Sequence, residues 1–430
     1  MLFHLVEKKL VLSVSLTKRF GIKQGGGVAI IVAIALPLLI GMAGLALDLG
    51  KLFVTKTELQ NAADACALSA ARELNGTAAQ FTAAETAGIT VGQANNAFFQ
   101  TDAVVLPVND AVRFSTALDG TYQPKTSLTG LTPAQAATYR FVRCTATLGN
   151  IANWLIGVLN VIPGIAVADE QTVAAEAVAT LGPGQNSCNL LPIGVCNNVI
   201  TSTTPAGTWV NGIIGPGGNN ATLSGSFRWV DFDPPAGGAS EIRGLLTGNS
   251  CNKPIPGPGD DVNGPGFVAS GRQAFNTRFG LSHGGSDGVP DFTGFSYSPL
   301  ATPTVAINTN VFADFLSKRG TNTAFQGQAA SGIALTGGTS IRNSTNLAAN
   351  GRSRRIMVAP VVNCATMRIT TTTPTYACML LLHPMRTQGA ANFTMYMQYL
   401  GNANAIGECN QSGVAAGYGG TGPVVTFLVQ

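Results

Sequence analysis

The sequence predicts an α+β fold in which one N-terminal transmembrane helix continues into a long amphipathic helix, followed by a β-rich body. Three observations predict it. Residues 28–47 contain no charged side chain, apolar residues recur at helical spacing from there to about residue 74, and Gly- and Pro-rich sequence after residue 182 separates short β-branched runs. The chain therefore needs both a long helix and sheets.

The apolar stretch at residues 28–47, with Pro37 in its middle, has the length of a membrane span. Twenty helical residues cover roughly 30 Å, the thickness of the hydrocarbon core of a bilayer, whereas the apolar part of a signal peptide has about 7–15 residues. No small-residue cleavage site follows at once, so we expect an anchor that stays attached. Ala29 and Ala33 form a small-xxx-small pair that permits close contact between membrane helices.

Asp48 and Lys51 begin a second, water-facing pattern on the same helix. We interpret Asp48 as the point where the helix enters water, and pairing with a basic group on a neighbouring membrane helix is the alternative. Apolar residues then recur three, four and seven apart, and Asn75-Gly76 supply a helix stop. The stripe expected to pack on a sheet or a partner helix comprises Leu49, Leu52, Leu59, Ala63, Cys66, Ala70 and Leu74.

The order of features over residues 25–76 resembles a known family. A basic cluster, three glycines, an apolar span with a proline, GLALDLG and KTELQNAADACALSAARELNG follow one another. This segment is similar to the N-terminal part of the TadG-like and TadE-like proteins, which accompany assembly of Flp (Tad) pili. Shorter pieces such as YRFVRCT and RRIMVAPVVNC resemble the longer TadG-like members. Many of those carry a von Willebrand A domain with a metal-binding D-x-S-x-S, and this sequence has no such string, so that metal site is not carried over.

The net charge of +4 lies ahead of the apolar span. Residues 1–27 hold five basic residues and one acid, which leaves 20 of the 25 basic and 20 of the 21 acidic residues for the rest of the chain. The positive-inside rule then predicts a single-pass protein of the bacterial inner membrane, with residues 1–27 as a cytoplasmic lead and the body in the periplasm. A body without net charge argues against nucleic acid as a partner.

All eight cysteines follow the span, on the side where disulfides can form. They are Cys66, Cys144, Cys188, Cys196, Cys251, Cys364, Cys378 and Cys409. Short loops favour the bridges Cys188–Cys196 and Cys364–Cys378, although the sequence leaves the connectivity open. Cys66 lies on the apolar stripe, where burial as a small hydrophobe and a bridge are equally good interpretations.

A metal site is the alternative to disulfides. The sequence has no C-x-x-C, and its histidines, His4, His283 and His383, are not at ligand spacing from cysteine pairs. A phosphate loop, a dinucleotide fingerprint, HExxH and a haem motif are also absent from the sequence. We therefore predict no catalytic, cofactor-binding or metal-binding residues, and no small-molecule substrate.

The first domain is expected at residues 28–182, anchor included. Its predicted elements are a helix near 78–99, strands at 104–108, 111–118 and 139–147, a short helix at 151–159 and a strand at 172–181. A long helix laid over a small antiparallel sheet is an α+β arrangement and resembles a pilin-like subunit. Residues 182–184, Gly-Pro-Gly, are interpreted as a hinge.

The second domain, residues 183–430, is predicted to be β-rich and Gly/Pro-rich. Short strands between ordered loops are expected at 208–214, 226–232 and 241–246, an extended loop at 251–265, and a polar surface segment at 301–350. The clearest strands are expected at 355–362, 376–383, 393–400 and 424–429. These should be central, and the first is apolar enough to be buried on both faces.

One string matches the nucleophile elbow of a hydrolase. It is Gly280-Leu281-Ser282-His283-Gly284, with Asp287, Asp291 and His383 following in triad order. An elbow needs a buried strand before the serine and a helix after it, whereas glycine-rich loop sequence surrounds Ser282. With 52 glycines, chance matches are expected, so an anchored serine hydrolase is a disfavoured alternative.

Two further charged groups invite a functional interpretation. Loop carboxylates can hold calcium. Four aspartates of the second domain lack the spacing of a calcium loop, however, and are interpreted as solvated turn residues. They are Asp260, Asp261, Asp287 and Asp291. A basic cluster could bind an acidic partner or lipid headgroups and is interpreted as a solvated lead into a strand. It comprises Arg352, Arg354 and Arg355.

The sequence thus predicts a non-catalytic, inner-membrane-anchored structural component of a Flp (Tad) pilus or related secretion apparatus. What the resemblance implies is protein–protein contact with other pilus-assembly or minor pilin proteins. The alternative is an anchored surface or periplasmic binding and adhesion module in which residues 185–350 recognise a ligand. The binding partners, the oligomeric state and processing of the N-terminal helix are left open.

Overall fold

The computed structural model describes residues 25–161, 164–187, 190–214, 227–234, 238–248, 253–264, 268, 270–284, 288–388, 392–405, 407–416 and 420–429. Cys188, Cys251 and Asp287 lie outside these ranges. The chain divides into two compact units: unit 1 comprises residues 1–63, 91–106 and 145–176, and unit 2 comprises residues 64–90, 107–144 and 177–430. The expected domain boundary at residues 182 and 183 stays a prediction.

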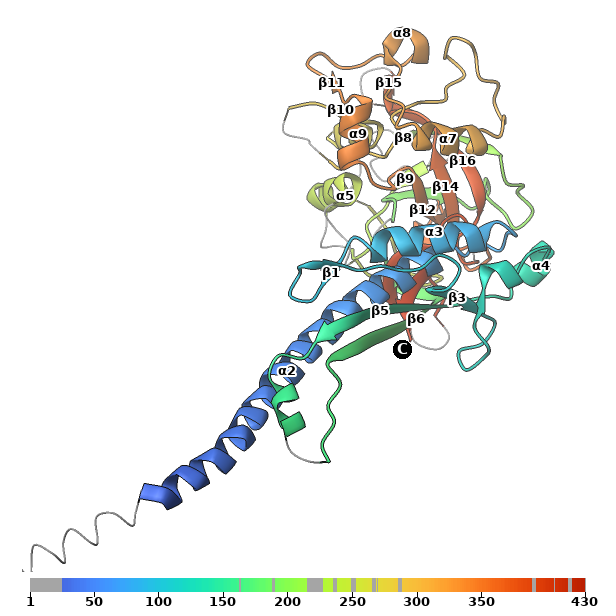
Figure 1. Ribbon diagram of the computed structural model, residues 1–430. Coiled ribbons are helices and arrows are strands. Elements are labelled where there is room, and N and C mark those ends of the chain that lie inside the picture. The colour runs from blue at the N-terminus through green and yellow to red at the C-terminus, as the bar shows by residue number, and fades with distance from the viewer. Residues whose placement is uncertain are drawn as a thin grey trace, which may run out of the picture. The chain divides into compact units, whose positions relative to one another are not determined.

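The long helix is confirmed as one element, α2 (Gly25–Arg72), of 48 residues with Pro37 inside it. It is drawn in blue in Figure 1. Two features end it. Asn75 and Gly76 follow, Gly76 with a left-handed φ of 81°, and the Gly76 N–H donates to the Gln80 side chain at 2.8 Å. The predicted stop at Asn75-Gly76 therefore lies where the helix ends.

The second helix, α3 (Gln80–Gly92), lies beside the C-terminal part of α2 in unit 2 (Figure 1). Gly88 makes close packing possible, because a Cβ there would lie 3.1 Å from Ala70 Cβ and from the Cys66 sulfur. The sequence predicted this helix as far as residue 99. It ends earlier, and residues 98–100 have positive φ values of 55–63°, which a right-handed helix cannot include.

A six-stranded sheet has the order β17-β18-β6-β5-β3-β4. Its strands are β3 (Val112–Ser115), β4 (Gln123–Pro124), β5 (Phe141–Ala152), β6 (Glu170–Ser187), β17 (Gln411–Ala415) and β18 (Val424–Leu428). Strand β18 is antiparallel to β6, with Val424 opposite Pro183 and Leu428 opposite Ala179. The hinge expected at residues 182–184 is therefore wrong, because these residues are paired inside β6.

Unit 1 contains the N-terminal part of α2, the C-terminal part of β5 and the N-terminal part of β6. It also contains β1 (Asn96–Ala97), β2 (Asp102–Ala103) and the 3₁₀ helix η2 (Ile156–Val161). The predicted short helix at 151–159 starts later, as η2. The strand predicted at 104–108 is wrong: β2 ends at Ala103, and Pro107 offers no N–H for a strand ladder.

An eight-stranded sheet in unit 2 has the path β15-β16-β14-β12-β7-β9, with β13 on β12 and β8 on β16. Its strands are β7 (Ile193–Cys196), β8 (Trp209–Ile214), β9 (Phe227–Trp229), β12 (Ile356–Asn363), β13 (Arg368–Ile369), β14 (Tyr376–Leu381), β15 (Arg386–Gln388) and β16 (Asn392–Asn402). The predicted central strands β12, β14 and β16 are confirmed. Seven of the eight residues of β12 are buried, as expected for a strand covered on both faces.

Short helices surround this sheet in unit 2 (Figure 1). They are α5 (Gly238–Thr247), α6 (Gly271–Asn276), α7 (Phe312–Gly320), α8 (Gly327–Ser331) and α9 (Ser344–Asn350), with the 3₁₀ turn η3 (Thr277–Phe279) and the small pair β10 (Leu281–Ser282) and β11 (Ser340–Ile341). The helix α4 (Pro133–Ala136) and the 3₁₀ turn η1 (Lys125–Ser127) lie instead near β3 of the six-stranded sheet. The strand expected at 241–246 is wrong. Ile242, Leu245 and Leu246 are buried on one side of α5, and a spacing of three and four is helical.

Three disulfides are present among the described residues. They join Cys66 to Cys144, Cys196 to Cys364, and Cys378 to Cys409. Both pairings favoured by short loops are therefore wrong, since Cys196, Cys364 and Cys378 have other partners. The sheet explains why: Cys196 lies opposite Val362 in the parallel pair of β7 and β12, which brings Cys364 close across 168 residues of sequence.

Candidate interaction site along the long helix

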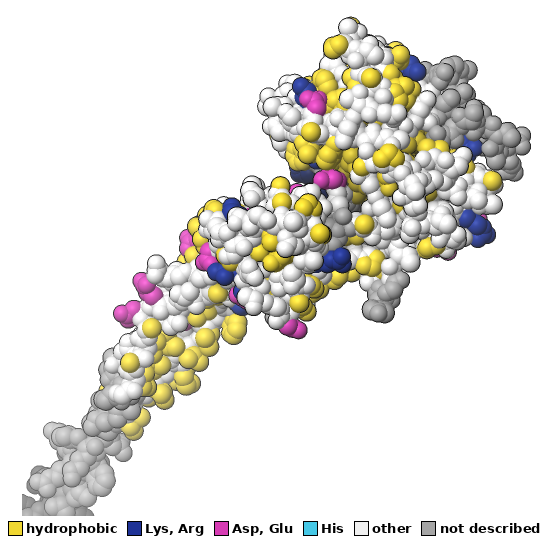
Figure 2. Space-filling view, turned by 90° about the vertical axis from the view of Figure 1, so that its right-hand side faces the viewer, with side chains coloured by type: hydrophobic (Ala, Val, Ile, Leu, Met, Phe, Trp, Pro, Cys, Tyr) yellow, Lys and Arg dark blue, Asp and Glu magenta, His cyan; other side chains and the backbone are white. Residues whose placement is uncertain are grey.

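The first part of α2 presents apolar side chains outward. Val28, Ile31 and Leu39 have exposed fractions of 64%, 68% and 59%. Among the described residues, the helix is the one long and apolar enough to cross a membrane, and 18% of its most apolar window is buried. In Figure 2, hydrophobic side chains, in yellow, gather along this helix. A helix of a soluble core would bury this surface, so the exposure suits lipid.

Asp48 holds a loop against this helix, within unit 1. Its carboxylate oxygens accept three backbone N–H groups, from Trp154 at 3.0 Å, Leu155 at 3.0 Å and Ile156 at 2.9 Å. These amides lie at the start of η2, where free N–H groups need an acceptor. The side chain is 2% exposed. The prediction that Asp48 marks entry into water is therefore wrong, because its charge is used inside unit 1.

Lys51 continues this polar contact one turn later. It is buried, it donates to the Ala152 carbonyl, and its ammonium lies 4.4 Å from the ring centre of Trp154. Thr55 is also fully buried and donates to the Lys51 carbonyl. The polar side of the helix is thus turned inward between residues 48 and 55.

The next turns bind the outer parts of β5, β6 and the 98–100 turn, again within unit 1. Lys56 donates to the Ala174 carbonyl, and Gln60 donates to the Glu176 carbonyl at 2.9 Å. Glu58 accepts the Phe99 N–H and the Gln100 side-chain amide, each at 2.9 Å. Apart from the contact with the Gln100 side chain, these bonds are made to backbone groups, so they hold the strand and turn positions whatever side chains those positions carry.

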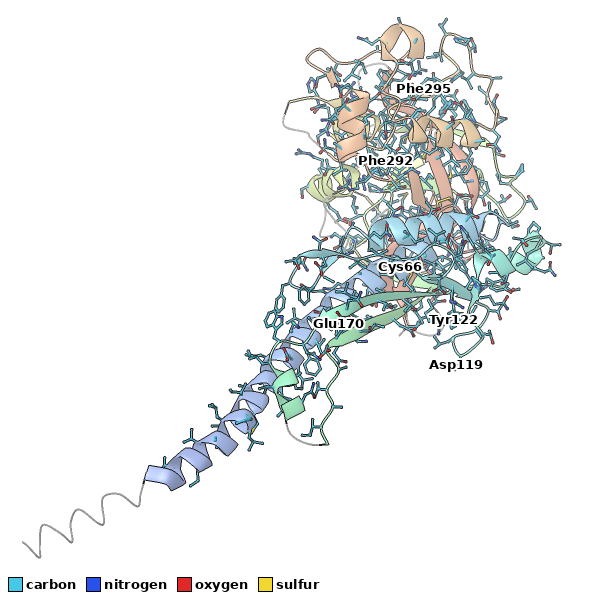
Figure 3. All side chains as sticks on the ribbon, in the orientation of Figure 1. Cys66, Asp119, Tyr122, Glu170, Phe292 and Phe295 are labelled. Carbon is cyan, nitrogen blue, oxygen red and sulfur yellow. A yellow bond between two sulfur atoms is a disulfide. The ribbon has the colours of Figure 1, made fainter. Side chains whose placement is uncertain are left out.

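The body end of α2 belongs to unit 2 and is held covalently. Cys66 is bonded to Cys144 of β5, with Cα atoms 6.0 Å apart; Figure 3 marks Cys66 on the helix. Asn410 donates to the Arg72 carbonyl at 3.2 Å and to the Leu74 carbonyl at 2.7 Å, which satisfies carbonyls that a helix end leaves free. Sequence reasoning missed Asn410, since it lies more than 300 residues from its partners.

The predicted apolar stripe is confirmed from Leu59 onward. Leu59, Ala63, Cys66, Ala70 and Leu74 each have an exposed fraction of 0%. Leu49, at 41%, is exposed, and Leu52 is half-buried, so the stripe is wrong at its membrane end. The helix thus buries polar side chains between residues 48 and 55 and apolar side chains from residue 59 onward.

The hydrolase-like residues are not arranged as an elbow. Ser282 ends the two-residue strand β10 and is followed by a loop. Both ring nitrogens of His383 contact backbone, Nδ1 the Pro384 carbonyl at 2.8 Å and Nε2 the Tyr396 N–H at 3.2 Å. Burial lowers the pKa of His383 to about 4. A neutral imidazole with both nitrogens occupied has no position left for a serine proton.

Asp291 and two arginines of the predicted surface cluster are buried, so their interpretation as solvated residues is wrong. Asp291, 0% exposed, accepts the backbone N–H groups of Arg354 at 2.7 Å and Arg355 at 3.0 Å, and pairs with Arg319 at 3.3 Å. The guanidinium of Arg355 donates to the Leu381 carbonyl. Of the three clustered arginines, Arg352 is exposed as expected.

This buried network holds the segments around β12 together. Arg278 donates to the carbonyls of Arg354 and Leu245, and the guanidinium of Arg355 lies 4.3 Å from the ring centre of Phe279. Burial lowers the pKa of Arg355 to about 10, so it stays charged at neutral pH. Arg319 lies over Phe292, which is labelled in Figure 3 with Phe295, whose carbonyl accepts from Arg355. The arginines thus organise loops and do not face a partner.

Two of the predicted loop carboxylates are solvated, and three other carboxylates form a cluster. Asp260 and Asp261 are exposed and accept the N–H groups of Gly257 and Asn263, as expected of turn residues. Sequence reasoning missed a second group, in which oxygen atoms of Asp231, Asp233 and Glu241 lie within 4.8 Å of one another. Lys253 already neutralises part of this charge, at 2.7 Å from Asp233 and 3.3 Å from Glu241.

Comparison with known proteins finds a family model that matches α2. Residues 26–73 match the family model described as putative Flp pilus-assembly TadE/G-like. No curated protein and no solved structure matches the chain. The matched segment coincides with α2, from its exposed apolar part to its disulfide-bonded end, so the resemblance seen in the sequence is confirmed for this helix.

Proposed function

We propose that this protein is a non-catalytic, membrane-anchored structural component of Flp (Tad) pilus assembly that acts through protein–protein contacts. The observation that carries the proposal is the coincidence of the Tad-like segment with α2. That helix is apolar and exposed at one end, and at the other it is bonded to the body through Cys66 and Cys144. A helix built this way would tether the folded body to the membrane.

The charge distribution and the disulfides support the proposed orientation. The basic lead before residue 28 favours a cytoplasmic N-terminus in the bacterial inner membrane, and three disulfides favour a periplasmic body. Fusions of alkaline phosphatase, active only outside the cytoplasm, test this. Activity is expected after residue 429 and not after residue 24. The reverse pattern would reject the orientation.

Pilus counts on cells test the structural role. A strain lacking the gene is expected to lose Flp pili, and the wild-type gene is expected to restore them. Replacing Ile31, Leu39 and Leu47 by lysine is expected to prevent restoration, because three charges in the span cost several kcal/mol each in lipid. Ser282→Ala is the matched control and should restore pili fully. Loss of pili with Ser282→Ala would favour the hydrolase alternative.

A second candidate, an adhesion module, is favoured by apolar side chains that lie exposed on unit 2. Leu300, Ile307 and Leu316 have exposed fractions of 46%, 52% and 44%. Deleting residues 201–300 would remove core residues such as Phe227 and Phe275, so it would unfold the body. Changing the three exposed residues to serine is the sharper test: lost surface adhesion with normal pili would favour the module.

A further inference from the structure

We propose that the loop around η2 is seated in the outer leaflet of the membrane beside α2, with Trp154, Leu155 and Ile165 in contact with lipid. The inference rests on the proposed anchoring of α2 and adds a second membrane contact. All residues involved belong to unit 1.

The loop around η2 packs against the part of α2 that precedes Asp48. Leu159 contacts Gly41, and a Cβ on Gly44 would lie 2.7 Å from the Leu155 backbone. Gly41 precedes Asp48 by seven residues, roughly 10 Å along a helix that rises about 1.5 Å per residue. The loop therefore reaches down beside the uncharged stretch of the helix. Interfacial segments lie about 5–10 Å into the headgroup and acyl boundary, which is the same range.

The second step is the chemistry of the loop. Residues 145–168, a run of 24 residues that includes η2, contain no charged side chain. Trp154, Leu155 and Ile165 expose 62%, 38% and 41% of their surface. Tryptophan is enriched where membrane meets water, because its ring is apolar and its N–H is polar.

The third step is the reversed polarity of α2 beside the loop. Asp48, Lys51 and Thr55 are buried, with exposed fractions of 2%, 3% and 0%, whereas Leu49 and Phe53 expose 41% and 69%. A water-facing helix has the opposite arrangement. Polar groups in a membrane are directed inward and bonded to one another or to backbone, as Asp48 is to the η2 amides. Lipid is thus the occupant that suits this surface, up to about residue 54.

Tryptophan fluorescence of the intact protein in lipid nanodiscs tests the proposal. Trp154 is one of three tryptophans, and Trp209 and Trp229 are buried in unit 2. Lipids brominated at acyl carbons 6 and 7 are expected to quench roughly one third of the emission, and lipids brominated at carbons 11 and 12 less. Aqueous iodide should quench little. Trp154→Phe, which keeps an apolar ring, should abolish the lipid quenching.

Equal emission in brominated and ordinary lipid, or iodide quenching of about a third of the signal, would overturn the proposal. Lipid quenching that persists in Trp154→Phe would do the same, since it would come from other residues. A partner protein covering the patch gives emission quenched by neither reagent and also overturns it. Failure of the protein to enter nanodiscs would reject the anchoring of α2 and the loop proposal together, whereas entry without quenching rejects only the loop.

Discussion

Cys66 of α2 is bonded to Cys144 of β5, 78 positions further along the sequence. Cys66 was equally compatible with a bridge or with simple burial, and the structure shows the bridge. Within unit 2, the bridge joins the long helix to the six-stranded sheet. The C-terminal end of α2 is therefore held by a covalent bond as well as by packing.

Removing this bridge should lower stability markedly. A closed loop of this length predicts a loss of about 4 kcal/mol when Cys66→Ala and Cys144→Ala are combined, because the unfolded chain gains freedom. The midpoint of thermal unfolding, followed by circular dichroism in mild detergent, measures it. Replacing Cys378 and Cys409, which close a shorter loop of 31 residues, is the matched comparison and should cost less. An unchanged midpoint in the first variant would contradict the bridge.

Asp291→Ala should destabilise unit 2 by about 3–5 kcal/mol. The change removes the carboxylate that faces Arg319 and accepts the Arg354 and Arg355 amides, and it leaves buried positive charge uncompensated. The midpoint of urea unfolding checks this. Asp261→Ala, at an exposed turn, is the control and should change stability by less than about 0.5–1 kcal/mol. Equal effects of the two changes would mean that the network is not structural.

Glu241 should make stability depend on pH. Burial raises its pKa to about 7, the nearby Asp233 and Asp231 act in the same direction, and Lys253 opposes them. Because the folded protein holds this proton more tightly than the unfolded chain, whose glutamate pKa is near 4.5, the contribution is present below pH 4.5 and is lost as pH rises through 7. At pH 8, Glu241→Gln should therefore be more stable than wild type by on the order of 1–3 kcal/mol and unfold at a higher temperature, whereas at pH 5 the two proteins should unfold at nearly the same temperature. A difference of the same size at both pH values would refute the assignment.

Asp48→Ala should release the start of η2. Three backbone amides lose their acceptor, so hydrogen exchange at Trp154, Leu155 and Ile156 is expected to rise at least about tenfold, since a hydrogen bond to a charged group is worth about 1.5–3 kcal/mol. Hydrogen–deuterium exchange with mass spectrometry in detergent measures it. Thr57→Ala, an exposed position on the same helix, is the control. Unchanged exchange in Asp48→Ala would show that the loop is held by other contacts.

The parts of the fold with local periodicity could be predicted from the sequence. Helix α2 and strands β12, β14 and β16 follow from apolar patterns within one element. Contacts between distant residues could not. The pairing of Cys196 with Cys364 depends on a parallel register between β7 and β12, and the burial of Arg355 depends on carbonyls from residues 295 and 381.

The candidate site shows the same limit. The exposed span followed from composition, whereas the charge-free run at 145–168 does not single out the loop, because residues 177–227 are uncharged as well. The role of Asp48 needed the structure, because a carboxylate at the end of a span has the same sequence pattern whether it meets water or three backbone amides. Its acceptance of the η2 amides is visible only when residues more than 100 positions apart are brought together.

The most direct test of the central claim is affinity purification of the intact protein from membranes in mild detergent. Mass spectrometry identifies its partners, and sequencing reads its own N-terminus. Co-purification with other Flp-pilus assembly or minor pilin proteins, with the span still attached, is the result that a membrane-anchored assembly component predicts. Recovery of the body alone from the soluble periplasmic fraction, cut after the span and without partners, would contradict it.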